Sequence, residues 1–313
     1  MRTLEIKFPK ADFTIDHQQP IALLGSCFSD EISSHFILNG FDTYSNPLGT
    51  IFHPLVISRF LNDLCLGTEK ERTVLREDVW LSWDAGSAKH AMSEEELVSL
   101  LQSAREQWRE KLSKASVLFV TFGTAWEYQL KETNLVVANC HKFPSALFQR
   151  SMTSSEVLLK HWKETIALLE SHYPQLRIIF TVSPVRHSKE GLIENNRSKA
   201  ELIRLVAELQ KLKNCSYFPS YELVIDVLRD YRYFDQDLVH PSVEAIQFVW
   251  EQLERTYFDT PTLELAKQVR QIKMGEEHRI IHPKSQAARL FKEDLLNKKN
   301  TLFLDFPYLK KWS

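Results

Sequence analysis

Two short stretches contain residue types that could together perform nucleophilic catalysis. In the first, Gly25 and Ser26 follow the apolar run 21–24, and helix-forming sequence continues from Asp30. This order predicts a buried strand, a tight turn at Gly25 and a helix N-terminus. A serine at such a turn lies at the carboxyl end of a strand, where open α/β sheets bind their ligands. Taken alone, Gly25 and Ser26 favour ordinary turn chemistry over a catalytic role.

Asp237 and His240 supply the two groups that a nucleophilic serine requires. Such a serine needs a base to accept its proton, and the base needs a third group to orient it. The two intervening residues let the aspartate turn back onto the imidazole, and Pro241 is suited to the start of a helix. Since the tetrad follows the fifth predicted strand, we expect it at the same sheet edge as Ser26. The three side chains are therefore candidates for acyl transfer.

Acyl transfer also needs hydrogen-bond donors aimed at the oxyanion that forms. The backbone N–H groups of Ser26 and of Gly49, which follows the second predicted strand, are candidates. Gly123 or Thr124, after the third strand, could provide more. For Gly49 and Gly123 the alternative is that they serve turn geometry alone.

Apolar runs alternate with helical periodicity, which predicts an α/β core. The predicted strands are 21–24, 41–45, 116–122, 176–182 and 216–221. The predicted helices are 30–39, 54–66, 93–113, 154–172, 196–211 and 243–257. Because a helix separates the first two strands, they should be parallel with a right-handed crossover.

Two β-hairpins are predicted as insertions, at about 73–92 and 128–142. The first alternates, contains Trp80 and Trp83, and has a turn signal at 84–87. We expect a core domain over 1–258 and a charged, helical C-terminal extension over 259–313. The basic segment 284–299 is predicted to be a packed outer helix rather than a partner-binding element.

Composition limits the classes of function. The chain has 313 residues, 43% hydrophobic content and a net charge of −2, which allows a sizeable core and gives no reason to expect nucleic acid or an anionic membrane as partner. No leader peptide or membrane-spanning run is expected. Four scattered cysteines predict neither a zinc site nor a disulfide framework. A cytoplasmic protein without a cofactor is the expectation.

The other histidines and the cysteine beside Ser26 have simpler interpretations. His53, His90 and His141 could join His240 as metal ligands, but none has HxxxH or HxH spacing, so no metal is predicted. Cys27 is expected to be a small buried hydrophobe rather than a reactive thiol.

Polar residues near the sheet edge leave two interpretations open. Asn139 and His141 lie in the second insertion near Trp126, where substrate contact and loop scaffolding are equally compatible with the sequence. The segment 195–198 is predicted to cap a helix. The lesser alternative is that Arg197 or Lys199 contacts an anionic substrate.

Six separated blocks, in order, resemble the GSCFA-domain family. The first is Gly25-Ser26-Cys27-Phe28-Ser29, with serine where the family name has its final alanine. The other blocks are 46–51, 123–126, 139–142, 183–185 and 237–241. The resemblance spans roughly residues 4–257.

The resemblance implies a fold and a set of roles. That family is grouped with the SGNH/GDSL hydrolases, whose fold is a flavodoxin-like, three-layer α/β/α sandwich around a parallel five-stranded sheet. It implies Ser26 as nucleophile, His240 as base, Asp237 as the orienting acid and Gly49 as an oxyanion glycine.

One position departs from the superfamily pattern. SGNH enzymes usually have Gly-x-Asn-Asp after the third strand, but here Ala125 stands where the asparagine would donate a hydrogen bond. Thr124, Asn46 or Asn139 are the candidate replacements.

The expected function is an SGNH-type serine esterase that acts through an acyl-enzyme. Its partner would be a small-molecule or glycan ester, since Trp80, Trp83 and Trp126 offer flat faces suited to a sugar ring; this substrate class rests on analogy within the superfamily. One alternative is an acyltransferase that modifies a polysaccharide from an acyl-CoA donor. A non-catalytic carbohydrate-binding module, which Ala125 favours, and a structural subunit are the others. The acyl group, the acceptor and the oligomeric state are left open.

Overall fold

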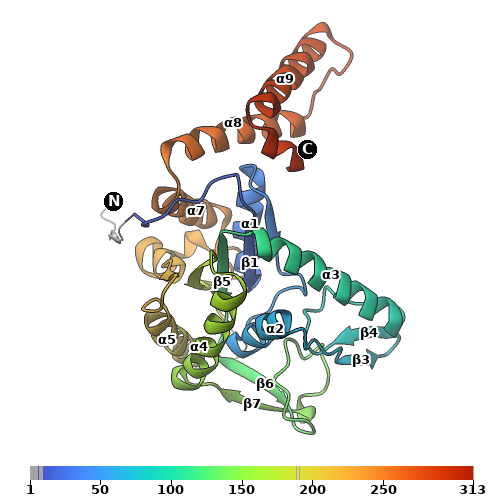
Figure 1. Ribbon diagram of the computed structural model, residues 1–313, viewed down its shortest axis with the longest axis vertical. Helices are drawn as coiled ribbons and strands as arrows, with labels where there is room; N and C mark the ends of the chain where they lie inside the picture. Colours follow the sequence, from blue (N-terminus) through green and yellow to red (C-terminus); the bar gives the residue numbers. More distant parts are fainter. Residues whose placement is uncertain (1–5, 7–9, 188, 190, 313) are drawn as a thin grey trace.

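The computed structural model describes residues 6, 10–187, 189 and 191–312, and a five-stranded parallel sheet forms its centre (Figure 1). The strands, in spatial order, are β2 (Thr43–Ser45), β1 (Ile21–Gly25), β5 (Val117–Phe122), β8 (Arg177–Val182) and β9 (Cys215–Tyr217). In order of appearance within the sheet this is 2-1-3-4-5, the strand order of flavodoxin-like folds. The predicted fold class is confirmed.

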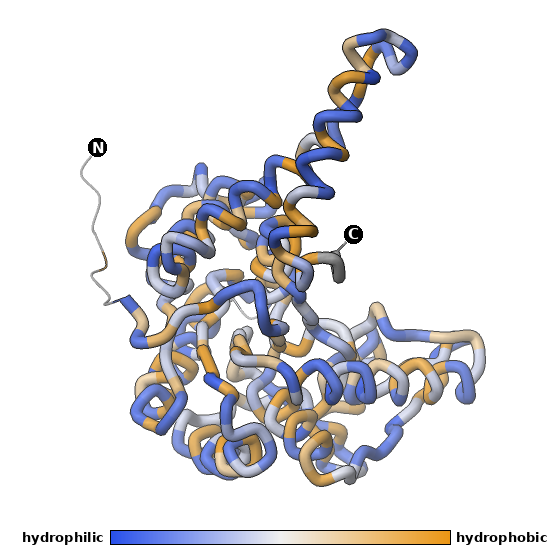
Figure 2. The backbone as a smooth tube through the Cα atoms, turned by 45° about the horizontal axis from the view of Figure 1, so that its top comes forward, coloured by the Kyte–Doolittle hydropathy of each residue, from blue (hydrophilic) through white to orange (hydrophobic). Residues whose placement is uncertain are grey.

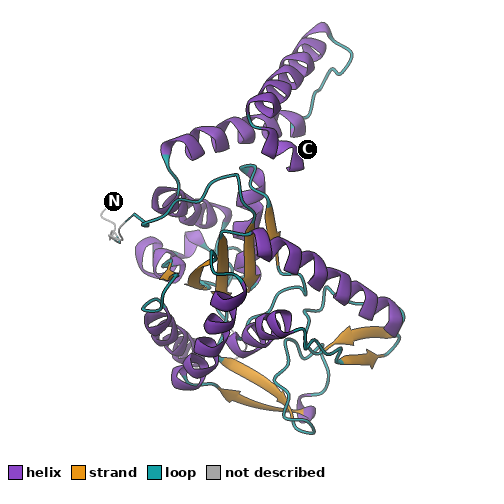
Figure 3. Cartoon of the chain, viewed as in Figure 1, coloured by secondary structure: helices purple, strands orange, loops and turns teal. Residues whose placement is uncertain are grey.

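Helices cover both faces of the sheet (Figure 3). One layer contains α2 (Pro54–Leu66), α3 (Glu94–Lys114), α4 (Ser155–His172) and α5 (Leu192–Leu209). The other contains α1 (Cys27–Leu38), α7 (Val243–Tyr257) and the π-helical segment η3 (Leu223–Leu228), which follows the short α6 (Ser220–Glu222).

The alternation of side chains along β1 explains the two layers. Ala22 and Leu24 belong to the hydrophobic cluster with α2 to α5, whereas Ile21 and Leu23 belong to the cluster with α1 and α7. Successive strand residues point to opposite faces, so an unbroken apolar strand must be covered on both sides.

The strand order changes direction at β1. This strand pairs with β2 on one side and with β5 on the other, and both pairings are parallel. Because α1, which follows β1, and α4, the next helix after β5, lie on opposite faces, the loops at this edge diverge and leave a crevice. Ser26 and Gly123, the residues that follow β1 and β5, lie at this crevice.

Several predicted boundaries agree with the structure. The helices expected at 54–66, 154–172 and 243–257 are confirmed within one residue. Two helices begin earlier than expected: α1 starts at Cys27, directly after Ser26, and α5 starts at Leu192. The first turn of α1 has weak helix formers, but Phe28 is fully buried there, so packing overrides propensity.

The first insertion contains two chain reversals, of which only the second was predicted. Strands β3 (Thr73–Arg76) and β4 (Val79–Ser82) are joined at residues 77–78, where Glu77 has a φ of 58°. The chain also reverses around the predicted turn at 84–87, because Trp80 and Ala91 exchange backbone hydrogen bonds of 2.9 and 3.2 Å. Gly86 in this turn also allows contact with the loop after β2, where its N–H donates to the Leu48 carbonyl at 2.8 Å.

The second predicted hairpin, at about 128–142, is present in part: Gln129 and Val136 form an antiparallel bridge, and Val137 N–H donates to the Tyr128 carbonyl at 2.9 Å. Strand β6 (Trp126–Leu130) pairs antiparallel with β7 (Phe148–Met152), which lies beyond the predicted segment 128–142. The signal was weak because β7 is polar over 149–151. The segment 131–147 between the strands contains only the 3-10 turn η1 (Ser145–Leu147) among its regular elements.

The C-terminal segment is helical, as predicted, and projects as an arm from the sheet (Figure 2). It consists of α8 (Thr260–Glu277), α9 (Gln286–Asp305) and the 3-10 turn η5 (Pro307–Trp312). Leu265, Val269, Ile272, Leu302 and Leu309 form its own hydrophobic cluster. Its contact with the core includes Lys273, whose Nζ donates to the Ile37 carbonyl at the end of α1.

Gly25 is required where β1 meets β5. Its φ is +134°, and a Cβ there would lie 2.1 Å from the Thr121 carbonyl oxygen. Any side chain would therefore push β1 from β5 at the point where Ser26 leaves the sheet.

We predict that Gly25→Ala lowers the free energy of unfolding by about 3 kcal/mol or more, since it combines backbone strain with a clash against main chain. Gly67→Ala is the matched control: Gly67 has a φ of +65° but nothing within 4 Å of its Cβ position. The control should cost about 1 kcal/mol. Equal losses for the two variants in urea unfolding would contradict the importance of the β1–β5 approach.

Candidate active site

Ser26 is the first residue beyond β1 and the N-cap of α1. Its backbone is extended (φ −71°, ψ 173°), and its side chain does not cap the helix, unlike that of a typical N-cap serine. The residue is 1% exposed, and its Oγ is a buried atom without a hydrogen-bond partner. A buried hydroxyl without a partner carries a desolvation cost, so its retention at this edge calls for an explanation.

Asp237 and His240 form a close pair in the loop before α7. His240 Nδ1 lies 2.6 Å from Asp237 Oδ2. The other carboxylate oxygen accepts from the backbone N–H of Val239 at 2.8 Å and of His240 at 3.0 Å. The loop achieves this turn with Leu238 at a φ of 57°. The predicted fold-back of the aspartate onto the imidazole is thus present in the structure.

The hydrogen bonds of this pair define its charge state. The His240 backbone N–H, the imidazole and the Val239 N–H together lower the pKa of Asp237 to about 2. An ionised aspartate accepts a proton-bearing Nδ1, which leaves the lone pair of a neutral imidazole on Nε2. Nε2 is therefore the atom that could act as a base.

A cavity of about 210 Å³ connects His240 with the start of α1. Cys27 and Phe28 line it from the helix, and His240 and Pro241 line it from the loop. Ser26 Oγ and His240 are not hydrogen-bonded. The pair and the serine thus border the same region of the sheet edge without direct contact between the reacting atoms. Catalytic contacts of this kind often tighten only when substrate binds.

Cys27 differs from the expectation of a buried hydrophobe. It is only partly buried and faces this cavity. Burial is nevertheless the main effect on its thiol, and it raises the pKa. A thiol with a raised pKa is a weak nucleophile near neutral pH.

The backbone donors predicted for the oxyanion are engaged in local hydrogen bonds. Ser26 N–H donates to the Thr121 carbonyl at 3.2 Å, and Gly49 N–H to the Asn46 carbonyl at 2.8 Å. The N–H groups of Gly123 and Thr124 both donate to the Phe52 carbonyl, at 2.9 and 3.2 Å. An oxyanion would have to replace the carbonyl that accepts from one of these N–H groups. The hydrogen bonds of Ser26 N–H and Thr124 N–H, both 3.2 Å, are the longest of the four.

Asn46 holds the loop after β2 against the turn after β1. Its Oδ1 accepts from Gly25 N–H at 2.8 Å, and its Nδ2 donates to Asp30 Oδ1 at 2.9 Å. Asn46 is 8% exposed and has a φ of 41°. These contacts give its amide a positioning role for the turn that presents Ser26.

The remaining predicted binding residues separate into two groups. Trp126, Thr124 and Asn139 line a cavity of about 320 Å³, together with Phe52, Tyr128 and His187. Arg150 lies over the Trp126 ring at 4.2 Å. Of the three tryptophans expected at a pocket, Trp126 lines this cavity and Trp83 lines a different one, formed by the two insertions.

His141 scaffolds the insertions. It is 3% exposed, and its Nε2 lies 2.7 Å from the Ser82 carbonyl. Its carbonyl accepts from Arg76 Nη1 at 2.6 Å, and its N–H is bound by Asn139 Oδ1 at 2.7 Å. The structure thus places His141 in loop scaffolding, one of the two alternatives that the sequence left open.

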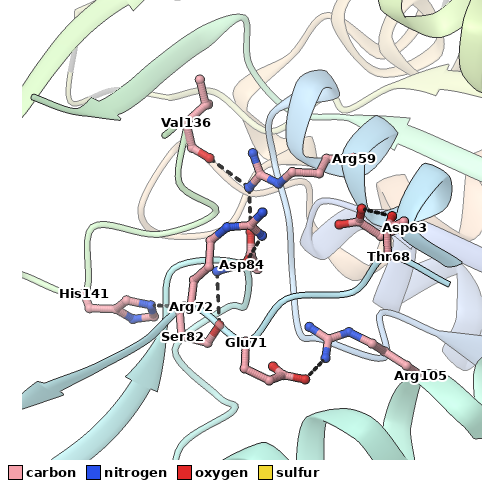
Figure 4. A network of polar contacts seen from close by, with 10 residues as sticks. All are labelled: Arg59, Asp63, Thr68, Glu71, Arg72, Ser82, Asp84, Arg105, Val136 and His141. Carbon is pink, nitrogen blue, oxygen red and sulfur yellow. Dashed lines mark hydrogen bonds and ion pairs between the residues drawn. The ribbon is translucent and has the colours of Figure 1, made fainter. Parts of the chain in front are cut away.

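A network of charges fastens the first insertion to the core (Figure 4). Asp84 accepts from Arg59 on α2 at 2.6 Å and from Arg72 at 2.7 Å. Arg59 also donates to the Val136 carbonyl of the second insertion at 2.9 Å. Arg59 therefore ties α2 to both inserted segments, and Asp84 adds Arg72 to the same network.

Lys199 was considered only as a lesser candidate for contact with an anionic substrate, and the prediction that the segment 195–198 caps a helix was wrong, because α5 begins at Leu192 with Gly191 as its N-cap. Lys199 is 1% exposed, and its Nζ donates to the carbonyls of Gly123 at 2.6 Å and Ser183 at 2.7 Å. The sequence does contain a signal for the burial of Lys199, because this residue shares the helix face of the apolar Leu202 and Val206. Arg197, by contrast, pairs with Glu194.

Other classes of site were searched over the part of the chain that the structure describes. No group of three or more histidine, cysteine, aspartate or glutamate side chains there could hold a metal ion. No described helix combines the length and apolar character needed to cross a membrane.

These features define a flavodoxin-like α/β protein with a serine after β1 and an Asp–His pair at the same sheet edge. The GSCFA family model matches residues 20–253, three quarters of the chain. The chain belongs to the GSCFA family. A search among curated proteins found no match.

Solved structures with a partial likeness include three esterases. An acetyl esterase variant with acetate ion has 10% identity and a TM-score of 0.31, over 80% of this chain and 99% of the other. A family 3 carbohydrate esterase from Talaromyces cellulolyticus has 9% identity and a TM-score of 0.31, over 80% and 98%. An acetyl xylan esterase from Butyrivibrio proteoclasticus has 12% identity and a TM-score of 0.39, over 76% and 63%. At these values no residue role is transferred.

We predict that Asp84→Asn lowers the free energy of unfolding by about 2–4 kcal/mol, because two partly buried guanidinium groups lose their shared charge. The exposed pair Asp294–Lys298 on α9 is the control, and Asp294→Asn should cost under about 0.5 kcal/mol. Chemical denaturation measures both. An unchanged free energy of unfolding in Asp84→Asn would show that the network does not fasten the insertion.

Proposed function

We propose that this protein is a serine esterase that removes acyl groups from carbohydrate esters through an acyl-enzyme. The observation that carries the proposal is the Asp237–His240 hydrogen bond of 2.6 Å, in a loop that borders the same cavity as the start of α1. An exposed pair of this kind serves no core packing. It leaves a lone pair on His240 Nε2, and His240 borders the cavity at the start of α1, next to the buried and unpartnered Ser26 hydroxyl.

In the proposed reaction, Ser26 Oγ attacks the ester carbonyl carbon while its proton passes to His240 Nε2. Collapse of the tetrahedral intermediate breaks the ester C–O bond, and the leaving alcohol takes the proton from His240. Water then attacks the acyl-enzyme and gives a proton to His240. The bond between Ser26 Oγ and the acyl carbon breaks, His240 returns the proton to Oγ, and the carboxylic acid is released. Asp237 holds Nδ1–H throughout and stabilises the imidazolium.

The proposal requires a small change in distance between the start of α1 and the loop that carries Asp237 and His240. Ser26 Oγ must come within about 3 Å of His240 Nε2, and Ser26 N–H must exchange its long bond to Thr121 for the oxyanion. The positive end of the α1 dipole favours negative charge at this place. Since Ala125 supplies no side-chain donor, we expect a rate lower by about 10²–10³ than with a full oxyanion hole.

The cavity of about 320 Å³ supports a carbohydrate as the substrate class. Its aromatic residues Trp126, Tyr128 and Phe52 present apolar surfaces, and Thr124 and Asn139 add polar groups. Sugars combine apolar ring faces with hydroxyl groups, so they match a lining of this mixed kind.

The esterase proposal predicts that Ser26→Ala and His240→Ala each lower the rate of p-nitrophenyl acetate hydrolysis by about 10³ or more. Ser34→Ala is the matched control, because Ser34 is an exposed serine of α1 whose Oγ bonds only to the Asp30 carbonyl among the contacts described. Its rate should not change. Hydrolysis that survives in Ser26→Ala would contradict Ser26 as nucleophile.

The orienting role of Asp237 gives a separate prediction. Asp237→Asn should lower kcat by about 10²–10⁴ with little change in KM, because an amide does not hold the tautomer that exposes a lone pair on Nε2. Asp230→Asn is the control, since Asp230 pairs with Arg232 rather than with the imidazole. Steady-state kinetics distinguish the two. A pure KM effect would show that Asp237 acts in binding instead.

A non-catalytic carbohydrate-binding module is the second candidate. The engaged backbone donors of Ser26, Gly49 and Gly123 favour it, because none is free for an oxyanion. This candidate predicts glycan binding, measured by calorimetry, that is unchanged in Ser26→Ala, together with no ester hydrolysis by the wild type. Acyl transfer from acetyl-CoA to a glycan, without hydrolysis, would instead support a transferase.

A further inference from the structure

A buried lysine lies between the loops that follow β5 and β8. Lys199 Nζ donates to Gly123 O at 2.6 Å and to Ser183 O at 2.7 Å. Gly123 follows β5 and Ser183 follows β8, and these strands are paired up to Phe122 and Val182. Lys199 therefore joins the two loops immediately beyond the last paired residues.

Two neighbours on the same face of α5 complete the attachment. Ser198 Oγ accepts from Ala125 N–H at 2.7 Å and lies 3.0 Å from Thr124 Oγ1. Asn195 Oδ1 accepts from His187 N–H at 3.0 Å. Positions 195, 198 and 199 are three and four residues apart, so they lie on one side of the helix. We call this set the α5 clamp.

The positive charge of the clamp has no carboxylate partner among the ion pairs described. The groups that face it are Cys27 of α1, His187 of the loop after β8 and the Tyr221 ring of α6, 6.0 Å away. Taking an ammonium group out of water without a counter-ion is costly. A neutral donor could make the same two hydrogen bonds to carbonyl oxygens at a lower desolvation cost. The positive charge itself therefore calls for a function.

The position of the charge suggests that role. The loop 123–125, to which Lys199 and Ser198 bond, is the loop in which Ala125 leaves the proposed oxyanion site without a side-chain donor. A fixed cation in a water-excluded site stabilises developing negative charge strongly, because the local dielectric is low.

We infer that Lys199 is a positioning residue of the proposed esterase, which fixes the loop 123–125 and supplies the positive charge that favours the oxyanion formed at Ser26. The inference rests on the proposed function. It requires the charged form of Lys199 for full activity.

Burial lowers the pKa of Lys199 to about 7. The ammonium is therefore present below pH 7 and is lost as the pH rises through that value. The rate at which a fluorophosphonate labels Ser26 should therefore fall above pH ~7, as Lys199 loses its proton.

The test compares wild type, Lys199→Met and Lys199→Arg over pH 5–9. Lys199→Met should label at least about tenfold more slowly at acidic pH and show no alkaline fall. Lys199→Arg, which stays charged, should also show no fall. Lys211→Met, an exposed lysine paired with Glu208 beyond the end of α5, is the control and should keep the wild-type profile.

The outcomes distinguish failure of the proposed esterase function from failure of the inference about Lys199. Absence of labelling in folded wild type at every pH overturns the proposed function and this inference with it. If wild type is labelled and Lys199→Met shows the same pH profile of labelling, only the inference about Lys199 is overturned. If both variants fail to fold, NMR of wild type with ¹³C-labelled lysine side chains replaces them. One lysine must then titrate at the midpoint of the alkaline fall; a fall without such a lysine overturns the inference.

Discussion

The approach of β1 to β5 at Gly25 is the constraint on which the rest of the site depends. With no Cβ, Gly25 brings the main chain against Thr121, and the chain can turn directly into α1 with Ser26 at its N-terminus. Asn46 fixes the same turn from the loop after β2 through Gly25 N–H and Asp30. The position of the serine is thus set by the close main-chain approach of β1 to β5 and by the side chain of Asn46.

A second set of contacts determines what surrounds the serine. The α5 clamp joins the loops after β5 and β8, and the Asp84 network ties both inserted segments to α2. The loops after β1, β2, β5 and β8 are therefore held by buried polar bonds, while the Asp237–His240 pair is half exposed on the remaining loop. We infer that this loop is the element that adjusts when a substrate brings Ser26 and His240 together.

The sequence predicted the parts of this structure that depend on local pattern. Strand β1, helix α2 and the fold-back of Asp237 follow from apolar runs, capping residues and short-range spacing, and they are confirmed. Strand β7 was not predicted, because this polar strand pairs with β6 through contacts distant in sequence. Lys199 was missed as a clamp for the same reason: a helix pattern shows which face is buried, but not which carbonyls lie opposite it. Likewise, no pattern shows that Gly49 and Gly123 donate their N–H groups elsewhere.

The central claim is that Ser26 is an activated nucleophile. Mass-spectrometric mapping of the residue modified by a fluorophosphonate tests it most directly, since the serine oxygen would displace fluoride and retain the phosphonyl group. The account predicts one adduct per chain, on the peptide that contains Ser26, and none in His240→Ala after the same time. An adduct on another residue, or none on folded wild type, would contradict it.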